Sequence, residues 1–289
     1  LWRSAFSNES FSGASAAGAG LVVAASDTGR VFGLDAATGA ARWRRETDGR
    51  FRHAPLTGQS AGGAVLWLVS QEDGRLFCLR ASDGAVLWTS EATNRCDGEP
   101  VAWPGFLAYG NCDGAVYVFS AADGKPAGTI AVGDDDQMAG GVLAIPDGRL
   151  VTGTRQGNLA VVNPLSGKCE AKVKVSESEA FVTPVAVANG LVAMGTDEGQ
   201  VTLWRLAPGA AAPVPAGRAE AGAPVKSLAA AGGRIFALAG GALVVLDSKG
   251  GLSQRLALGD EAGPLAVSAA GELACVADGA LVCVKGGAE

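Results

Sequence analysis

The stretch Ser26–Trp43 reads SDTGRVFGLDAATGAARW and contains one copy of the unit from which this chain is built. A polar turn ends in Gly29, a short apolar segment follows, and a second turn ends in Gly39. Glycine accepts the positive φ that tight turns between strands require, and the β-branched and aromatic residues between the turns favour a strand. The stretch therefore predicts a β-hairpin followed by a further strand.

Both glycines recur along the whole chain at intervals of roughly 40 residues. The first series is Gly29, Gly74, Gly114, Gly157, Gly199, Gly241 and Gly279. The second series is Gly39, Gly84, Gly124, Gly167, Gly209 and Gly250. A period near 40 with abundant glycine and no helical pattern is typical of the blades of a β-propeller.

Each repeat predicts four antiparallel strands. Two apolar runs flank the first glycine and form a hairpin, a third strand precedes them, and a fourth follows the second glycine. Several of the preceding strands begin after a proline, as in Pro55-Leu56, Pro100-Val101 and Pro184-Val185. The last repeat ends after its third strand, and the segment Leu1–Phe6 (LWRSAF) resembles the fourth strands. We therefore predict an all-β, seven-bladed propeller in one domain, residues 1–289, in which Leu1–Phe6 pairs with Leu281–Lys285 and closes the last blade.

The segments Val31–Trp43 (VFGLDAATGAARW) and Leu76–Trp88 (LFCLRASDGAVLW) resemble the repeat of the pyrroloquinoline-quinone-like propeller family. The resemblance covers the chain as a repeat and implies the propeller fold. The family includes dehydrogenases, lipoproteins of outer-membrane barrel assembly and other extracytoplasmic binding proteins. We expect a non-catalytic binding or scaffold propeller, outside the cytoplasm, without a cofactor or metal.

The alternative is a quinone-dependent oxidoreductase or another propeller enzyme. Quinone-binding members of the family are larger and carry a vicinal cysteine pair and a calcium site. This sequence contains no Cys-Cys pair.

The net charge of the chain is −6, and the positions of its acidic residues bear on the kind of partner that it binds. In a propeller, the turns within the hairpins and the connections between blades share one face, and most of the acidic residues lie in these segments. We therefore expect an acidic loop face, which argues against nucleic acid and favours a protein or peptide partner with a basic surface. Solubility and the preference of Asp for turns explain the same pattern without a partner.

No transmembrane segment is predicted, because uncharged runs such as Ala180–Thr196 are interrupted by proline and turn residues. Because the chain begins inside a predicted strand, we expect it to have been cut from a longer precursor. The expected state is a monomer or part of a larger polypeptide.

The candidate binding residues lie on the predicted loop face and at the funnel that the inner strands surround. They are Arg52, His53, Glu99, Asp134, Asp135, Asp136, Gln137 and Lys226. The adjacent carboxylates of Asp134, Asp135 and Asp136 repel each other unless a cation such as calcium or hydrogen-bond donors compensate. Their spacing does not match a known calcium loop, so we expect a solvated acidic loop here and not a metal site. His53 is the only histidine, and no nucleophile motif accompanies it, which favours a structural role.

Cys96 and Cys112 each precede Asp-Gly, at places where the predicted pairing brings the start of one strand beside the end of the next. A disulfide between them and two free thiols both fit this pattern.

Tryptophans occupy the fourth-strand positions of three consecutive blades, Trp2, Trp43 and Trp88. The fifth blade has a proline-rich segment, Ala207–Ala221, at this place, which predicts a frayed or missing outer strand.

Overall fold

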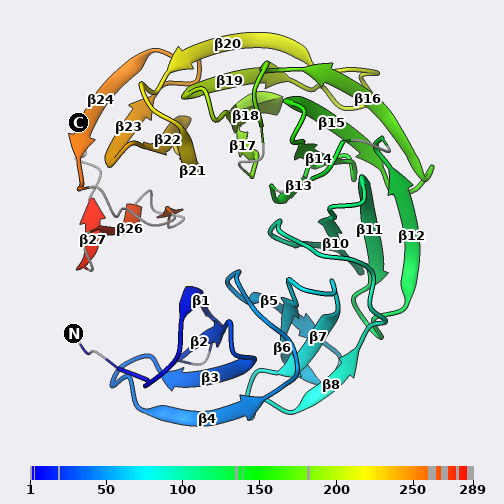
Figure 1. Ribbon diagram of the computed structural model, residues 1–289, viewed down its shortest axis with the longest axis vertical. Coiled ribbons are helices and arrows are strands. Elements are labelled where there is room, and N and C mark those ends of the chain that lie inside the picture. The colour runs from blue at the N-terminus through cyan, green and yellow to red at the C-terminus, as the bar shows by residue number, and fades with distance from the viewer. Residues whose placement is uncertain are drawn as a thin grey trace. The chain divides into compact units, whose positions relative to one another are not determined.

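The structure is a computed structural model that describes residues 2, 4–18, 20–133, 136–138, 140–180, 183–259, 265–267, 273–277 and 280–284. It forms two compact units, one of Leu1–Cys112 with Val116–Thr129 and one of Asp113–Ala115 with Ile130–Glu289. In the described part, the secondary structure is almost entirely antiparallel sheet, with one short 3-10 turn, η1 (Ala188–Gly190) (Figure 1).

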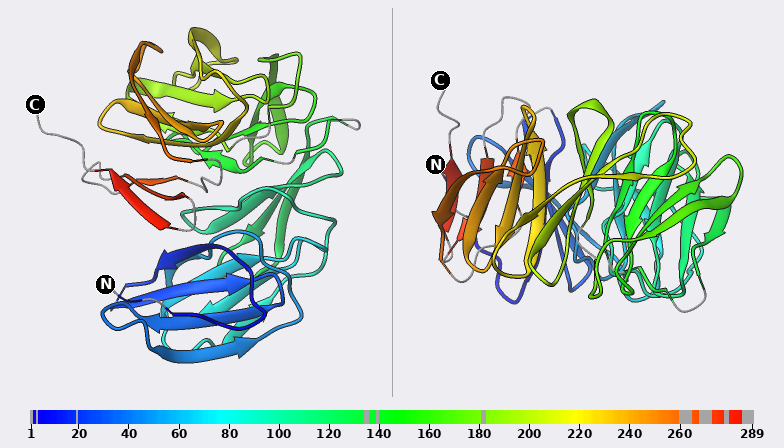
Figure 2. Two further views of the ribbon diagram at one scale, coloured as in Figure 1. Left: turned by 60° about the vertical axis from the view of Figure 1, so that its left-hand side comes forward. Right: turned by 90° about the horizontal axis from the view of Figure 1, so that it is seen from above.

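Each sheet is a meander in which consecutive strands pair, and the strands run side by side in both views of Figure 2. The first sheet contains β1 (Phe11–Ala16), β2 (Leu21–Ser26), β3 (Arg30–Asp35) and β4 (Ala41–Glu46). The second contains β5 (Leu56–Ser60), β6 (Gly63–Val69), β7 (Leu76–Arg80) and β8 (Val86–Thr89). The third contains β9 (Val101–Trp103), β10 (Phe106–Gly110), β11 (Ala115–Ser120) and β12 (Pro126–Ala131).

The later sheets repeat this plan. The fourth contains β13 (Val142–Ala144), β14 (Leu150–Gly153), β15 (Asn158–Asn163) and β16 (Lys168–Lys174). The fifth contains β17 (Val185–Val187), β18 (Leu191–Gly195), β19 (Gln200–Arg205) and β20 (Val214–Glu220). The sixth contains β21 (Val225–Ala231), β22 (Arg234–Ala239), β23 (Ala242–Leu246) and β24 (Leu252–Ala257). The seventh contains β25 (Ala266–Val267), β26 (Leu273–Ala277) and β27 (Ala280–Val284).

The predicted blade plan is therefore confirmed for six four-stranded sheets, and the described part of the seventh has three strands. The predicted closing strand is not among these elements, because no strand includes Trp2 or Ser4–Phe6. The predicted turn glycines have positive φ, for example +87° at Gly29 and +73° at Gly39, except that Gly279 lies outside the described residues. The prolines Pro55, Pro100 and Pro184 directly precede β5, β9 and β17 as expected.

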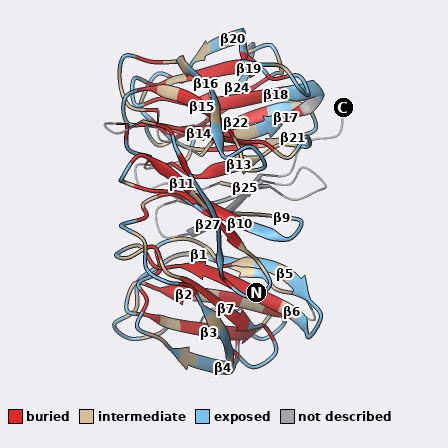
Figure 3. Ribbon diagram, turned by 90° about the vertical axis from the view of Figure 1, so that its right-hand side faces the viewer, coloured by how far each residue is buried: buried red, intermediate tan, exposed pale blue. Residues whose placement is uncertain are grey.

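Within each unit, apolar cores lie between successive sheets. In the six four-stranded sheets the second and third strands are the most buried, whereas outer strands such as β4 and β20 are largely exposed (Figure 3). One core joins the first and second sheets around Phe51 and Phe77, and another joins the second and third around Trp67 and Tyr109. The fourth and fifth sheets share a core around Met194 and Trp204. No blade buries both faces alone, so each depends on its neighbour.

The three tryptophans predicted at fourth-strand positions each pack on the glycine of a turn between the third and fourth strands of a sheet. The pairs are Trp2 on Gly39, Trp43 on Gly84 and Trp88 on Gly124. The indole N–H of Trp43 donates to the carbonyl of Ala81 over 3.0 Å. A Cβ atom at Gly84 would lie 2.6 Å from the Trp43 ring, so only glycine fits there. Trp2 makes the same kind of contact although it lies outside a strand, with its indole N–H 2.8 Å from the carbonyl of Ala36.

Candidate functional site

The strongest candidate site lies at the junction of the fourth and fifth sheets, within the second unit. A pocket of about 370 Å³ opens between the β13–β14 turn, strands β17 and β18, and the segment after β19. Its lining is mainly aliphatic, and Asp147 and Arg205 supply its charged groups. Pockets of this size with few polar groups bind small ligands or single side chains of a partner.

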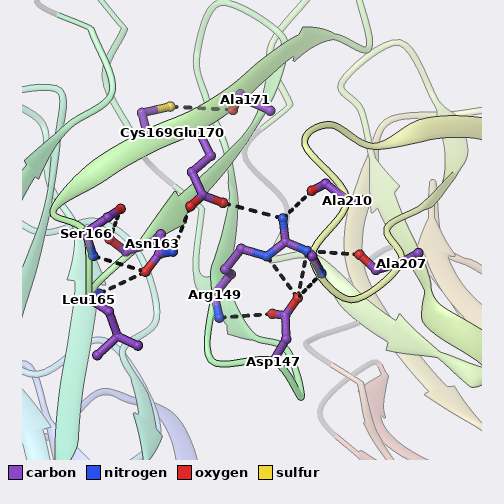
Figure 4. A network of polar contacts seen from close by, with 11 residues as sticks. Asp147, Arg149, Asn163, Leu165, Ser166, Cys169, Glu170, Ala171, Ala207 and Ala210 are labelled. Atoms are coloured by element: carbon purple, nitrogen blue, oxygen red, sulfur yellow. Dashed lines mark hydrogen bonds and ion pairs between the residues drawn. The ribbon is translucent and has the colours of Figure 1, made fainter.

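One wall of the pocket, Leu206–Pro208, is positioned by a buried arginine (Figure 4). Arg149 directly precedes β14, and its side chain is 5% exposed. Its guanidinium donates to the Asp147 carboxylate over 2.7 and 2.9 Å and lies 3.5 Å from the Glu170 carboxylate on β16. It also donates to the backbone carbonyls of Ala207 at 3.0 Å and Ala210 at 2.6 Å. We call these contacts the Arg149 network.

The Arg149 network satisfies a charge that would otherwise be costly to bury. The planar guanidinium binds carboxylate oxygens and carbonyls at once, a geometry that lysine cannot reproduce. Its hydrogen bonds hold the pKa of Asp147 below its usual range. The Asp147 carboxylate also accepts from the backbone N–H of Gly209 at 3.4 Å. The connection from β19 to β20 is therefore fixed to the fourth sheet by both members of one ion pair.

The prediction that the fifth sheet lacks its outer strand, or has a frayed one, is wrong. Strand β20 pairs with β19 from Val214 to Glu220. Pro213 lies just before the strand, and Pro215 lies at a register shift, where the ladder is already interrupted. The sequence signals that could have located the site are an arginine after a turn, in IPDGR, and the proline-rich connection, but no local pattern shows that they meet.

A second pocket of about 460 Å³ lies on the other side of the same connection and is more polar. It is lined by Asp147, Arg149, Asn163, Glu170 and residues 209–211. Asn163 donates to Glu170 over 2.7 Å, so the carboxylate is oriented by two partners.

Of the predicted binding residues, the structure brings His53 and Glu99 together in the first unit. Burial lowers the pKa of His53, whereas the nearby Glu99 carboxylate and the Asp97 backbone oppose this shift. The ring Nε2 atom is buried and has no hydrogen-bond partner among the described residues. Arg52 and Glu99 are exposed. A neutral histidine on this inner segment fits the structural role that its lone position favours.

Asp136, Gln137 and Lys226 belong to the second unit. Asp136 is 2% exposed and accepts hydrogen bonds from the Asn158 amide at 2.8 Å and the backbone N–H of Gln156 at 3.2 Å. Lys172 lies 3.4 Å from the same carboxylate. Asp136 is thus part of the fold, not of a solvated loop. Gln137 and Lys226 are exposed, and Asp134 and Asp135 lie outside the described residues.

Many of the described acidic residues of the predicted loop face are paired with cations. Arginines of the same turns and connections contact these carboxylates. Arg75 contacts both Asp48 and Asp73, at 2.9 and 2.6 Å. Further ion pairs in these turns and connections include Arg30 with Glu9, Arg50 with Glu72, Arg95 with Asp97, Arg155 with Glu179, Lys174 with Glu177 and Arg218 with Glu220. A basic partner would meet a mixed surface, not a field of one sign.

No disulfide joins Cys96 and Cys112 in the structure, where each sulfur is a thiol. The predicted proximity is present, because the Cys112 backbone N–H donates to the carbonyl of Arg95 over 3.2 Å. The Cys112 thiol donates to the Asp97 carboxylate over 3.3 Å. Burial raises the pKa of the Cys96 thiol to about 12. Each sulfur thus has its own polar partner, and Cys96 is held as an unreactive thiol.

The described residues can also be compared with what a metal site and a membrane-spanning helix require. In the described residues, no three His, Cys, Asp or Glu side chains gather as a metal ion requires. Across the same residues, no helix is both long enough and apolar enough to span a membrane.

The comparisons with known proteins agree with this architecture. The crystal structure of BamB from Moraxella catarrhalis matches with a TM-score of 0.76 and 20% identity, over 98% of this chain and 84% of that one. The computationally designed protein Ika8 matches with a TM-score of 0.65 and 15% identity, over 95% of this chain and 96% of its own. These matches show a BamB-like β-propeller fold. No curated protein matches in sequence.

The family assignment comes from the sequence as well. The family model described as outer membrane protein assembly factor BamB matches residues 1–210 and 112–254, which together cover most of the chain. The resemblance to the pyrroloquinoline-quinone-like (PQQ-like) repeat is therefore confirmed. The chain belongs to this BamB family of PQQ-like β-propeller repeat proteins.

Proposed function

We propose that the protein is a non-catalytic scaffold that binds another polypeptide outside the cytoplasm, during the assembly of outer membrane proteins. Membership of a family described as an outer membrane protein assembly factor supports this role. The structural observation that carries the proposal is the apolar pocket whose wall is held by the Arg149 network. A preformed pocket lowers the entropic cost of ordering an interface, which is what a scaffold requires.

The pocket suits one apolar side chain of a partner. Its aliphatic walls from the fourth and fifth sheets would exclude water from such an anchor. Arg205 at its edge donates to the carbonyl of Asn189 over 3.2 Å and is otherwise exposed, so it can also bind a backbone or side-chain oxygen of the partner. Interfaces commonly combine a buried apolar anchor with an arginine at its rim.

The acidic loop face is the second candidate surface. Asp197 is exposed there, and no ion pair to it is found among the described residues. A basic partner held by this face would bind more weakly as salt is raised, whereas an apolar anchor would not. The response of binding to salt separates the two surfaces.

We further propose that the propeller has seven blades and that Leu1–Phe6 supplies the last outer strand. The contact of Trp2 with Gly39 and Ala36 supports this, because it repeats the contact that Trp43 of β4 makes with the next sheet. Deleting Leu1–Phe6 would then remove both a strand and the contact of Trp2 with the first sheet.

The scaffold role is tested by copurification of the tagged protein from its own cell envelope, followed by identification of bound proteins. Ala186 is exposed and lines the pocket, so Ala186→Trp fills the pocket without disturbing the core. We expect Ala186→Trp to lose the outer membrane assembly proteins that the wild type retains. Leu165→Ala, which changes an apolar residue that is 90% exposed and outside the pocket, should retain them.

Other outcomes would contradict this assignment. Binding that survives Ala186→Trp but is weakened by Asp197→Asn and by salt would place the partner on the loop face. Saturable dye reduction with alcohols or sugars, in the presence of added quinone and calcium, would instead favour the enzyme alternative.

A further inference from the structure

A third cavity lies in the first unit and differs from the pocket described above. Its volume is about 570 Å³, and it lies between the β5–β6 and β9–β10 hairpins, with the turn Ala121–Ala122 at its side. Small-molecule sites in proteins occupy about 300–1,000 Å³, so it can hold a ligand of several rings.

The cavity combines aromatic surface with the absence of charge. None of the residues that line it is Asp, Glu, Lys, Arg or His. Trp67 and Trp103 contribute their rings, and Trp103 stacks on Phe106 with ring centroids 5.7 Å apart. Gly58 on β5 leaves room for Trp67, since a Cβ atom at Gly58 would lie 2.1 Å from that ring. A charged ligand would lose its hydration here without gaining an ion pair from the lining.

Several polar groups of the lining are open to a ligand. Among the described residues, no group hydrogen-bonds the Thr57 hydroxyl, the Gln59 amide or the indole N–H of Trp103. The Ser60 hydroxyl, in contrast, is engaged by its own turn, with Gly62 and Gly63. The open set therefore contains both donors and acceptors: one hydroxyl, one amide and one indole N–H.

We propose that this cavity binds a neutral oligosaccharide. A sugar ring presents an apolar C–H face to an aromatic ring and a rim of hydroxyls that both donate and accept hydrogen bonds. The stacked indole of Trp103 offers the first contact, and Gln59 and Thr57 offer the second. A proline-rich peptide would also stack on the rings, but proline residues have no N–H and leave the acceptors of Gln59 and Thr57 without a donor.

The test is a titration of the purified wild type with chitotetraose and maltotetraose, two uncharged oligosaccharides, and screening on an array of neutral and acidic glycans. We expect saturable binding of at least one neutral glycan, with a change in tryptophan fluorescence, and no preference for acidic glycans. Trp103→Ala should weaken binding at least about tenfold, the equivalent of about 1.4 kcal/mol. Gln59→Ala, on an exposed strand position, should weaken it without affecting folding, and Leu165→Ala should leave it unchanged.

The proposal is overturned if no neutral glycan binds at millimolar concentrations, or if binding is unchanged in both Trp103→Ala and Gln59→Ala. It is also overturned if a proline-rich decapeptide binds the wild type and the glycans do not. Circular dichroism of each variant separates a lost site from a lost fold.

Discussion

The first three sheets and the junction of the fourth and fifth are held together by different chemistry. In the first unit, a tryptophan of one sheet lies on a turn glycine of the next and donates one hydrogen bond to a backbone carbonyl, as Trp43 does with Gly84 and Ala81. At the later junction, the guanidinium of Arg149 bridges two carboxylates and two carbonyls of the next sheet's connection. The aromatic contact fills space, whereas the polar one fixes a loop and leaves a pocket beside it.

The two regions show that neighbouring sheets of one repeat can be held together by two kinds of contact, with different consequences for stability. An aromatic ring on glycine stabilises by burial and is insensitive to salt and acid. A buried ion pair contributes less net stability than its attraction suggests, but it is strongly directional and costly to break. The candidate pocket lies at the junction that has the second kind of contact.

The largest effect is expected for Arg149→Leu. The substitution removes the cation paired with the Asp147 carboxylate and the donor to two backbone carbonyls, which costs about 3–5 kcal/mol of unfolding free energy. Urea denaturation measures this loss. The matched control is Arg155→Leu, which removes an exposed arginine paired with Glu179 and should cost about 1 kcal/mol or less. Equal losses for the two variants would show that the network does not stabilise the junction.

Trp43→Ala should cost about 3 kcal/mol, because it removes the ring that fills the space over Gly84. Trp103→Ala serves as the aromatic control, since this ring is part of the cavity on the third sheet and locks no turn glycine. It should cost clearly less in the same denaturation experiment. If both tryptophans contributed equally, the contact with glycine would have no special role.

A pair of glycines separates backbone strain from the aromatic lock. Gly84 and Gly167 have the same φ of +68° at equivalent turns, but only Gly84 faces a tryptophan, and nothing lies within 4 Å of a Cβ at Gly167. Gly167→Ala should cost about 1 kcal/mol from the left-handed conformation alone. Gly84→Ala should cost more by the clash with Trp43. Equal melting temperatures for the two variants would contradict the account.

The smallest expected effect is on the unfolding free energy at low pH. The pKa of Asp147 is lowered by its hydrogen bonds from Arg149 in the folded state. A carboxyl with a lowered folded pKa stabilises the protein above its unfolded pKa of about 4, and this stabilisation is lost as the pH falls through the folded value. The difference in unfolding free energy between the wild type and Arg149→Leu should therefore shrink below about pH 4. The corresponding difference for Trp43→Ala should not change over this range, and a parallel decrease would contradict the polar lock.

The glycine and strand patterns predicted the blades well because they are local. The turn at Gly29 and the strands after Pro55 and Pro184 depend on a few neighbouring residues, and all formed as expected. The candidate site was missed because Arg149 and the carbonyls of Ala207 and Ala210 are far apart in sequence. No period or turn rule links them.

The loop face shows the same limit. The described carboxylates lie in turns and connections, but their charge was predicted without the partners that tertiary structure supplies. Asp136 is buried by contacts with Asn158 and Lys172, which come from β15 and β16. The predicted outer-strand loss failed because Pro215 lies at a register shift, a position that composition does not indicate.

The most direct test of the two locks is amide hydrogen exchange, measured by mass spectrometry on Arg149→Leu and Trp43→Ala under native conditions. We expect a reciprocal pattern, because the Arg149 network and the Trp43 contact each hold a different backbone segment. Arg149→Leu should accelerate exchange in residues 206–211 and not in 81–86, and Trp43→Ala should do the opposite. Equal acceleration of both segments by either variant would contradict the claim that the Arg149 network, and not general stability, holds the wall of the pocket.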